Sequence, residues 1–259
     1  MTRPETLHRI PARPWRWVGW LAASQAAVAA VWLWAGWLPG LVAMFASHAC
    51  FVVPVFLPRS RFYAPVLARL DPARPEVWLT IDDGPSDDTP LLLDLLDAHG
   101  ARATFFLVGE RAAARPALVR EIVRRGHGIG NHSQHHPQAW FWLLGPRRMA
   151  AEVGQAQAVL AALAGRPPRW FRSVVGMTNP FVAPALRRHG LQRVAWSARG
   201  YDGVDCVPEQ VVARIARDLR PGAIVLLHEG AAHGHNPQIL RAVLGILRKR
   251  GLETVVPEQ

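Results

Sequence analysis

Hydrophobic and polar positions divide the chain into two unlike parts. Between Trp17 and Pro58 no side chain is charged, and clearly polar pairs interrupt the apolar run only at positions 24–25 and 47–48. From residue 76 onward, short apolar or β-branched runs alternate with longer amphipathic runs. The first part has the composition of a membrane segment, and the second has that of an α/β domain.

The apolar part is long enough for two membrane crossings. Trp17–Trp37 supplies 21 residues, which at about 1.5 Å per residue cross a hydrocarbon core of about 30 Å. Leu41–Leu57 supplies 17 residues, which is marginal, and the Leu-Pro-Gly at 38–40 predicts a tight turn between the two segments. We therefore expect an α-helical membrane hairpin at 17–58, between a basic N-terminal segment at 1–16 and a linker at 59–75.

The positions of the tryptophans and arginines are those expected for a membrane hairpin. Six of the eleven tryptophans bracket the first segment, as side chains of an interfacial belt do. The arginines that flank the hairpin on its two sides are Arg3, Arg9, Arg13, Arg16, Arg59, Arg61, Arg69 and Arg74. By the positive-inside rule, both ends and the remaining domain lie in the cytoplasm, at an inner or plasma membrane. If the second segment, which contains Pro54, does not cross, the domain lies outside instead.

Beyond the hairpin, predicted strands and helices alternate. The strands are at 77–81, 103–108, 128–132, 170–173, 192–196, 223–228 and 252–256. One helix begins at Asp88 or Thr89, and the others cover 116–125, 147–164, 183–189, 208–219 and 237–250. This alternation implies a parallel sheet, either open or closed as a barrel, in a domain at 76–259.

Two acids follow the first of these strands, within Thr-Ile-Asp-Asp-Gly-Pro at 80–85. Neighbouring residues of a strand point to opposite faces, so Asp82 and Asp83 can share a site only where the strand breaks, as the following Gly-Pro forces it to do. Taken alone, the stretch could equally be a solvated Asp-Gly turn. The remainder of the chain favours a site.

Ionisable side chains gather at the ends of five predicted strands. They are Asp82 and Asp83, His132 and His136, Arg172, Asp202 and His228. Active sites of α/β barrels are built at the carboxyl ends of the strands. These residues therefore predict one catalytic site.

His132 and His136 are spaced i and i+4 within Asn-His-Ser-Gln-His-His-Pro. On a helical turn such a pair faces one way, while His135 points elsewhere. With a carboxylate from another strand, two histidines make a three-ligand metal site that leaves positions open for water and substrate. The alternative for the histidines alone is a hydrogen-bonded surface loop.

Charge and cysteine content narrow the function classes. The formal charge of +11 comes from arginine, because Lys249 is the only lysine, and it favours nucleic acid or an anionic lipid surface as partner. No basic stripe interleaved with aromatics and no zinc-finger or RNA-binding signature supports nucleic acid, so membrane lipid is the expected partner. Cys50 and Cys206 support neither a disulfide framework nor a cysteine-ligated metal.

The stretch from Val77 to the C-terminus resembles the polysaccharide deacetylase domain of carbohydrate esterase family four, known also from nodulation-factor deacetylases. The family's Thr-Phe-Asp-Asp-Gly-Pro is matched at 80–85, with Ile81 in the Phe place, and its His-Ser-x-x-His is matched at 132–136. Leu226 and His228 match its Leu-x-His. The resemblance covers about 180 residues. It implies an α/β fold, a distorted (β/α)7-type barrel.

The resemblance also implies roles for the motif residues. Asp83, His132 and His136 would hold one divalent metal ion, expected to be zinc. Asp82 would be the general base, and His228 would be the general acid that protonates the leaving amine.

Further residues would support these. Arg172 would pair with Asp82 and keep it ionised, Asp202 would orient His228, and Leu226 would line the pocket for the acyl methyl group.

Two departures from the family's pattern change the expected substrate. In place of Arg-x-Pro-Tyr-Gly the chain has Arg-Ser-Val-Val-Gly at 172–176, where the backbone N–H of Val175 could still serve the oxyanion. Gly203 follows Asp202 where the family places Trp. We therefore expect a wider and less aromatic site than one built for long chitin-like polymers.

The same features suggest a lipid context. Trp-Phe-Trp-Leu-Leu at 140–144 stands between the metal histidines and Arg147, and we expect this rim either to enter a bilayer or to pack in the core. The resemblance implies a metal-dependent amide hydrolase that removes an acetyl or similar small acyl group from an amino sugar, and the hairpin, the rim and the arginine excess favour a lipid-linked sugar. The expected partners are an amino-sugar glycan or glycolipid, linked to a lipid at the membrane, and no nucleic acid.

Three other interpretations stay open on the sequence. The enzyme could deacetylate peptidoglycan or exopolysaccharide on the outer side of the membrane. Two histidines and one carboxylate also describe non-haem iron oxygenases, although those need no neighbouring base or acid histidine. A non-catalytic subunit of a membrane glycan-synthesis complex is the third, although pseudoenzymes usually lose a ligand or base and here all are present.

Overall fold

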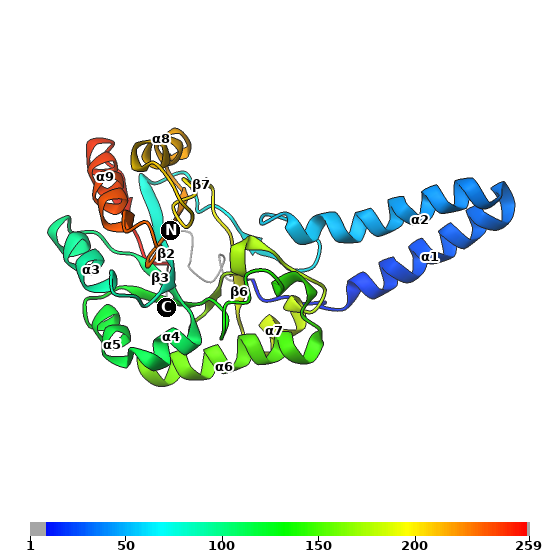
Figure 1. Cartoon of the computed structure of the whole chain (residues 1–259), viewed down its shortest axis with the longest axis horizontal. Coiled ribbons are helices and arrows are strands. Elements are labelled where there is room, and N and C mark those ends of the chain that lie inside the picture. The colour runs from blue at the N-terminus through cyan, green and yellow to red at the C-terminus, as the bar shows by residue number, and fades with distance from the viewer. Residues whose placement is uncertain (1–8, 258–259) are drawn as a thin grey trace.

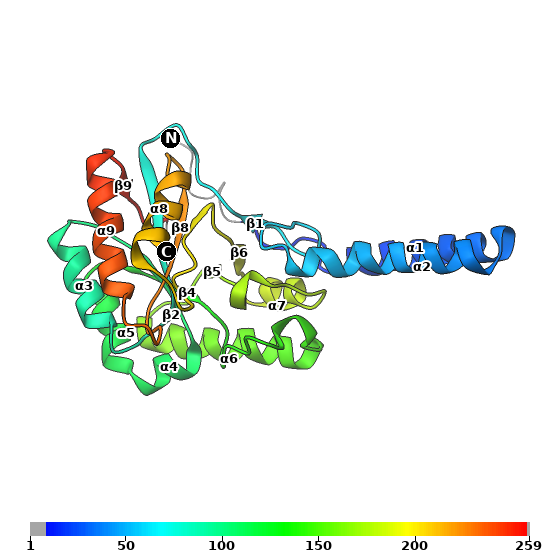
Figure 2. The ribbon, with the colours of Figure 1, turned by 45° about the horizontal axis from the view of Figure 1, so that its top comes forward.

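The computed structural model describes residues 9–257, which form a curled α/β domain and a helical hairpin. Figure 1 shows the hairpin helices, α1 (Arg16–Ala35) and α2 (Trp37–Val52), lying side by side and projecting away from the domain. The second view shows the same separation, with β1 and β6 at the side of the domain nearest to the hairpin (Figure 2). The division predicted from hydrophobicity is therefore visible in the fold.

Nine strands form the sheet in the described part of the chain. They are β1 Val66–Leu67, β2 Glu76–Gly84, β3 Thr104–Leu107, β4 Gly128–Asn131, β5 Trp170–Phe171, β6 Gln192–Val194, β7 Ala198–Arg199, β8 Ile224–His228 and β9 Glu253–Thr254. Their order is β1-β6-β5-β4-β3-β2-β8-β7, and β9 pairs with β2. Every pairing between these strands is parallel. Their carboxyl ends therefore lie at one edge.

The segment 192–199 curls this sheet into a distorted barrel. Its first part, β6, pairs with β5, and its last part, β7, pairs with β8 at the other end of the sheet. Between them, Ala195 N–H donates to Leu67 O at 2.8 Å and Ser197 N–H donates to Ile224 O at 2.9 Å. The two halves of the sheet are thus joined by one continuous piece of chain.

Helices cover the outside of the sheet. They are α3 Thr89–Ala98, α4 Gly109–Ala114, α5 Pro116–Arg124, α6 Pro146–Ala164, α7 Val182–Arg188, α8 Pro208–Asp218 and α9 Asn236–Lys249. Proline stands in the first turn of α3, α5, α6, α8 and α9, where its missing N–H costs no hydrogen bond. Their apolar faces pack on the strands: Leu93, Phe105, Ile122 and Leu240 are at most 1% exposed and belong to one core cluster.

All seven predicted strands and all six predicted helices are present, with ends that differ by a few residues. The sequence missed β1, β7 and α4 because they are too short for a period of 2.0 or 3.6 residues to show. β1 lies within the segment expected as a linker at 59–75, so part of that segment belongs to the sheet.

The turn of the hairpin differs from the prediction. It lies at Gly36, which has φ of 90°, and not at positions 38–40. Pro39 is tolerated in the first turn of α2, and Gly40 lets this helix approach α1, since a Cβ there would lie 2.6 Å from the Trp32 ring. The second segment is consequently longer than predicted, because the helical run Trp37–Phe56, which ends in a 3-10 turn, has 20 residues.

Both hairpin helices are long and apolar enough to cross a membrane, judged by length and composition. Only 6% and 11% of their apolar windows are buried, which is unlike the core helix of a soluble protein. Their polar side chains face one another: Gln25 Nε2 donates to Ser47 Oγ at 3.0 Å, and Ser47 Oγ donates to Ser24 Oγ at 3.1 Å. Polar side chains that hydrogen-bond to one another across the hairpin suit a pair of helices in a hydrocarbon environment.

The base of the hairpin lies against the carboxyl edge of the barrel. Phe56, which follows α2, packs on Trp142 with 5.3 Å between the ring centroids. Thr178 N–H donates to Val55 O at 2.9 Å, and the Trp17 and Phe181 rings are 6.1 Å apart. The loops after β4 and β5 therefore hold the hairpin on the side where the predicted site residues lie.

Candidate active site

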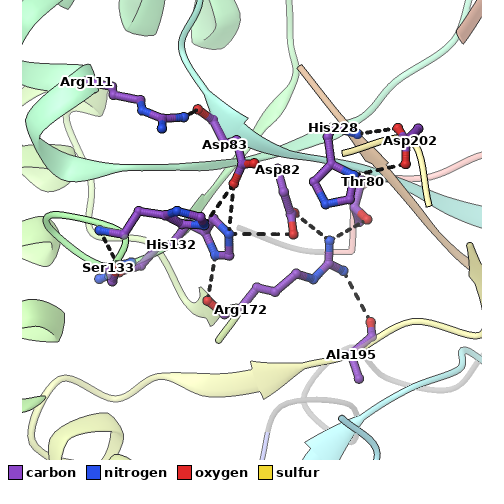
Figure 3. A network of polar contacts seen from close by, with 12 residues as sticks. Thr80, Asp82, Asp83, Arg111, His132, Ser133, Arg172, Ala195, Asp202 and His228 are labelled. Atoms are coloured by element: carbon purple, nitrogen blue, oxygen red, sulfur yellow. Dashed lines mark hydrogen bonds and ion pairs between the residues drawn. The ribbon is translucent and has the colours of Figure 1, made fainter. Parts of the chain in front are cut away.

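The two acids lie where β2 leaves the regular sheet. Asp82 pairs in register with His228 of β8, whereas the register to β3 shifts between Asp82 and Gly84. Asp83 takes a left-handed backbone conformation, with φ of 73°, and its carbonyl accepts a hydrogen bond from Arg111. This break lets two consecutive carboxylates face one site (Figure 3), as the sequence predicts.

Asp83, His132 and His136 come together as a group of metal-ligating side chains. Their ligand atoms lie within 4.8 Å of one another. Asp83 Oδ1 is 3.3 Å from His132 Nε2 and 3.1 Å from His136 Nε2. Among residues 9–257, no donor is directed at this buried oxygen well enough to form a hydrogen bond.

The electrostatics of this group fit a cation. His132 Nδ1 donates to the Arg172 carbonyl at 2.8 Å, so in the neutral ring Nε2 points a lone pair at the Asp83 carboxylate. Burial lowers the pKa of His132, but Asp82 and Asp83 raise it by more. Burial raises the pKa of Asp83, but the two histidines lower it by more. The raised pKa of His132 and the lowered pKa of Asp83 both show that positive charge is favoured at this group. One carboxylate with two imidazoles is also a donor set that suits a divalent metal ion.

The two histidines meet in an irregular loop. The helical turn that their i and i+4 spacing suggested is not what brings them together. β4 ends at Asn131, and Ser133 and His136 have φ of 69° and 52°. Ser133 Oγ accepts a hydrogen bond from His136 N–H at 3.1 Å, which fixes the turn. The predicted residues do meet, but left-handed residues in an irregular loop are the cause.

His135 points away from the site, as predicted, and is held by Glu152 of α6. Glu152 accepts hydrogen bonds from the N–H groups of Gln134 and His135 at 3.0 and 2.9 Å and from His135 Nδ1 at 2.7 Å. This acid braces the histidine loop. Its role was not predicted, because nothing in the sequence of α6 marks Glu152, the single acid of that helix, as buried.

Arg172 is fully buried and fixes Asp82. Its Nη1 donates to Asp82 Oδ1 and to Thr80 Oγ1, both at 2.7 Å, and its Nη2 donates to Ala195 O at 3.2 Å. Asp82 Oδ2 lies 3.8 Å from His132 Nε2. One oxygen of Asp82 is therefore occupied by the arginine, and the other faces the metal-ligating group (Figure 3).

His228 and Asp202 form the second charged pair of the site. His228 Nδ1 donates to Asp202 Oδ1 at 2.9 Å, and the N–H of His228 donates to Asp202 Oδ2 at 2.7 Å. Burial lowers the pKa of His228, but Asp202, with smaller contributions from Asp82 and Asp83, raises it by more, to about 9. Asp202 therefore orients the imidazole and favours its protonated form.

One cavity joins these groups. Seven of the nine predicted residues line it: Asp82, Asp83, His132, His136, Val175, Leu226 and His228. The other two, Arg172 and Asp202, contact Asp82 and His228 from behind. Val175 is 46% exposed and has φ of 46°, so its backbone bends at the cavity wall.

The expectation of a weakly aromatic site is wrong for one wall of the cavity. Val175 and Gly203 bring no ring, but Trp196 and Tyr201 line the cavity from another segment. Arg199 lies over both rings, with its Cζ 4.9 and 4.0 Å from their centroids. The sequence analysis missed these three residues, although the position of Tyr201 directly before Asp202 was a signal that could have found it.

The aromatic rim at 140–144 is buried in one part and exposed in another. Phe141 and Leu144 are buried in the core, whereas Trp140 and Leu143 are 64% and 54% exposed. Trp142 contacts Phe56 at the base of the hairpin. Part of the rim therefore packs in the core as expected, and entry of the exposed part into a bilayer stays a prediction.

Comparison with known proteins agrees with this geometry. Residues 69–194 match the polysaccharide deacetylase family model. A chitooligosaccharide deacetylase of Bradyrhizobium sp. (strain ANU 289) is 34% identical over 183 residues, which are 70% of this chain and 83% of the relative. The chain belongs to the polysaccharide deacetylase family. Membership confirms the predicted hydrolase class and decides against an oxygenase.

Solved polysaccharide deacetylase structures share the fold. The Bc1960 peptidoglycan N-acetylglucosamine deacetylase superposes with a TM-score of 0.69 at 27% identity, over 73% of this chain and 89% of that one. An acetyl xylan esterase of Clostridium thermocellum, solved with a cobalt ion, gives a TM-score of 0.62 at 31% identity, over 69% and 86%. A related barrel therefore binds a metal ion.

Proposed function

We propose that this polysaccharide deacetylase is a membrane-anchored, metal-dependent enzyme that removes the acetyl group from an N-acetylglucosamine-type sugar of a lipid-linked glycan. The observation that supports the chemistry is one cavity that brings together the Asp83, His132 and His136 group and two charged pairs, Asp82 with Arg172 and His228 with Asp202. The relatives named above support the amino sugar.

The metal-ligating group and Asp82 would perform the first half of the reaction. A divalent ion held by Asp83, His132 and His136, with zinc the expected one, would activate a water molecule and polarise the amide carbonyl. Asp82 Oδ2 would accept the proton of that water, since Oδ1 is bound to Arg172. The water oxygen then bonds to the carbonyl carbon.

His228 and its neighbours in the cavity would act in the second half of the reaction. His228, protonated because the nearby carboxylates, Asp202 above all, raise its pKa to about 9, would donate its Nε2 proton to the sugar nitrogen as the C–N bond breaks. Leu226 would contact the acyl methyl group, and the backbone N–H of Val175 would stabilise the oxyanion. The products are acetate and a free amino sugar.

The position of the hairpin supports a lipid-linked substrate. The loops that contact its base are also loops of the active-site edge. A cavity that opens beside a membrane anchor suits a substrate that is held in the same membrane. The arginines on both sides of the hairpin support a cytoplasmic active site.

Lipid extracts would test the proposal. Cells that contain the intact protein, the Asp82→Asn variant or no protein would be compared by mass spectrometry, and the membranes would be assayed for acetate release before and after metal chelation. We expect a lipid-linked sugar that is lighter by one acetyl group only with the intact protein. Asp82→Asn should lower the rate by about 10²- to 10⁴-fold and still bind metal. An unchanged lipid profile, or activity that survives chelation, would contradict the proposal.

A second candidate is a peptidoglycan deacetylase on the outer side of the membrane. The Bc1960 enzyme, which bears that name, supports it. A reporter fused to the C-terminus distinguishes the two, because activity of the reporter only outside the membrane would contradict the cytoplasmic orientation.

A further inference from the structure

A second cavity of about 790 Å³ adjoins the catalytic cavity and reaches the base of the hairpin. The two cavities share Val175, Trp196, Arg199 and Tyr201 as wall residues. At the other end the wall is formed by residues 56–58, which follow α2. We call this second cavity the arginine groove.

The groove has an excess of positive charge. Arg59, Arg199, Arg214 and Arg217 line it together with one acid, Asp218. Arg217 Nε lies 3.4 Å from Asp218 Oδ1. In the described part of the chain, the other three arginines have no acidic partner within 4.0 Å. These cations are therefore available to an anionic ligand.

Arg199 lies where the two cavities meet. Its guanidinium is held over the Tyr201 and Trp196 rings, and its buried Nε finds no acceptor among residues 9–257. Tyr201 has φ of 69°, an unfavourable conformation for a bulky residue, which places its ring against the guanidinium. A guanidinium held by aromatic faces and lacking an acid is suited to bind phosphate through two parallel hydrogen bonds.

Arg59 and Arg214 are each anchored by a backbone carbonyl. Arg59 Nε donates to Trp196 O at 2.9 Å, and Arg214 Nη1 donates to Gly200 O at 3.3 Å. These bonds hold both side chains at the groove and leave further N–H groups of each for a ligand.

We propose that the arginine groove binds the phosphate that joins the amino sugar to its lipid carrier, an inference that rests on the proposed lipid-linked substrate. The acetamido group lies in the catalytic cavity, the phosphate lies against Arg199, Arg59 and Arg214, and the first carbons of the lipid contact Phe56 and Leu57. Those two side chains are 47% and 50% exposed and continue the line of α2. A neutral polymer has no group that uses the unpaired arginines.

Three substrates separate the contributions of phosphate and lipid. The first is N-acetylglucosamine joined to a farnesyl chain through a phosphate diester, the second is the farnesyl glycoside without phosphate, and the third is N-acetylglucosamine 1-phosphate. The full chain is assayed in detergent micelles for acetate release. We expect kcat/KM to be about 10- to 100-fold higher for the first substrate than for the second, as for a charge-assisted hydrogen bond. It should also be higher for the first than for the third.

Variants assign this preference to the groove. Arg59→Gln and Arg214→Gln, made separately in case one fails to fold, should each reduce the ratio of kcat/KM between the first and second substrates by about 10-fold or more. Arg214→Lys, which keeps the charge, should retain part of the ratio. Arg241→Gln removes an exposed arginine of α9 that lies outside the groove, and it should leave the ratio unchanged.

The outcomes distinguish the groove from the proposed function. If the two farnesyl substrates react equally well, or if the groove variants keep the ratio, the phosphate site is wrong while the deacetylase stands. If N-acetylglucosamine 1-phosphate is preferred to its farnesyl ester, the lipid part is wrong. If no substrate releases acetate, the proposed function fails and the groove proposal fails with it.

Discussion

The catalytic cavity and the arginine groove share one wall, but they differ in whether their cationic side chains have carboxylate partners. At the catalytic residues each cation has a carboxylate partner, as Arg172 has Asp82 and His228 has Asp202, and only the shared wall residue Arg199 among the described residues of that cavity lacks one. In the groove, Arg59, Arg199 and Arg214 have no such partner in the described chain. Paired buried charges hold fixed positions, whereas unpaired cations are free to bind an anion.

This difference assigns different tasks to the two regions. A base and an acid must keep their geometry and protonation state throughout the reaction, and internal ion pairs provide this. A substrate site must release its ligand, so its partner comes from outside the protein. Mutations should therefore act on folding and chemistry in the cavity and on substrate preference in the groove.

The largest effect is expected for Arg172→Met, because it leaves the Asp82 carboxylate buried without its partner. We expect a loss of about 3–5 kcal/mol in the free energy of unfolding, measured by denaturant titration, with loss of activity. Arg193→Met is the matched control. Arg193 is nearly as buried, but among residues 9–257 its side chain donates only to the carbonyls of Pro58 and Ser60. Its loss therefore leaves no carboxylate without a partner and should cost less. Equal losses would show that the ion pair contributes nothing special.

A smaller effect is expected for Asp202→Asn, through the pH dependence of kcat/KM. In the wild type, rising pH deprotonates His228 near its pKa of about 9, so activity falls on the alkaline side. Without the negative charge of Asp202, the lowering effect of burial on the pKa of His228 is less well compensated. The pH at which kcat/KM falls on the alkaline side should therefore decrease by about one unit or more. Asp205→Asn, at an exposed acid nearby, should leave the profile unchanged. An unchanged pH for this fall in Asp202→Asn would mean that His228 is not the acid.

The smallest effect is expected from salt. Exposed charges are screened over about 10 Å at 0.1 M ionic strength, whereas buried pairs are screened much less. Raising the salt should therefore increase KM a few-fold for the phosphate-linked farnesyl substrate and leave KM for the neutral farnesyl glycoside nearly constant. Equal salt effects on both substrates would remove the distinction between groove and cavity.

Short motifs made most of the candidate site residues predictable. Asp82 and Asp83 stand in one six-residue motif, and His132 and His136 stand in another, so local order along the chain reveals them. Trp196 and Arg199 belong to no such motif, and they line the cavity because the segment 192–199 passes from β5 to β8. Residues that act through a long-range strand pairing leave no local signal.

The two-part division, the parallel α/β architecture and the candidate metal-ligating and catalytic residues could all be predicted from the amino-acid sequence. These depend on hydrophobic periodicity and on motifs of a few residues, which are local properties. Only the tertiary structure decided how the histidines meet, where the hairpin turns, and that its base lies beside the active-site edge. The arginine groove also appeared only there, because residue 59 and residues 199 and 214 are far apart in the chain and become neighbours when the barrel curls.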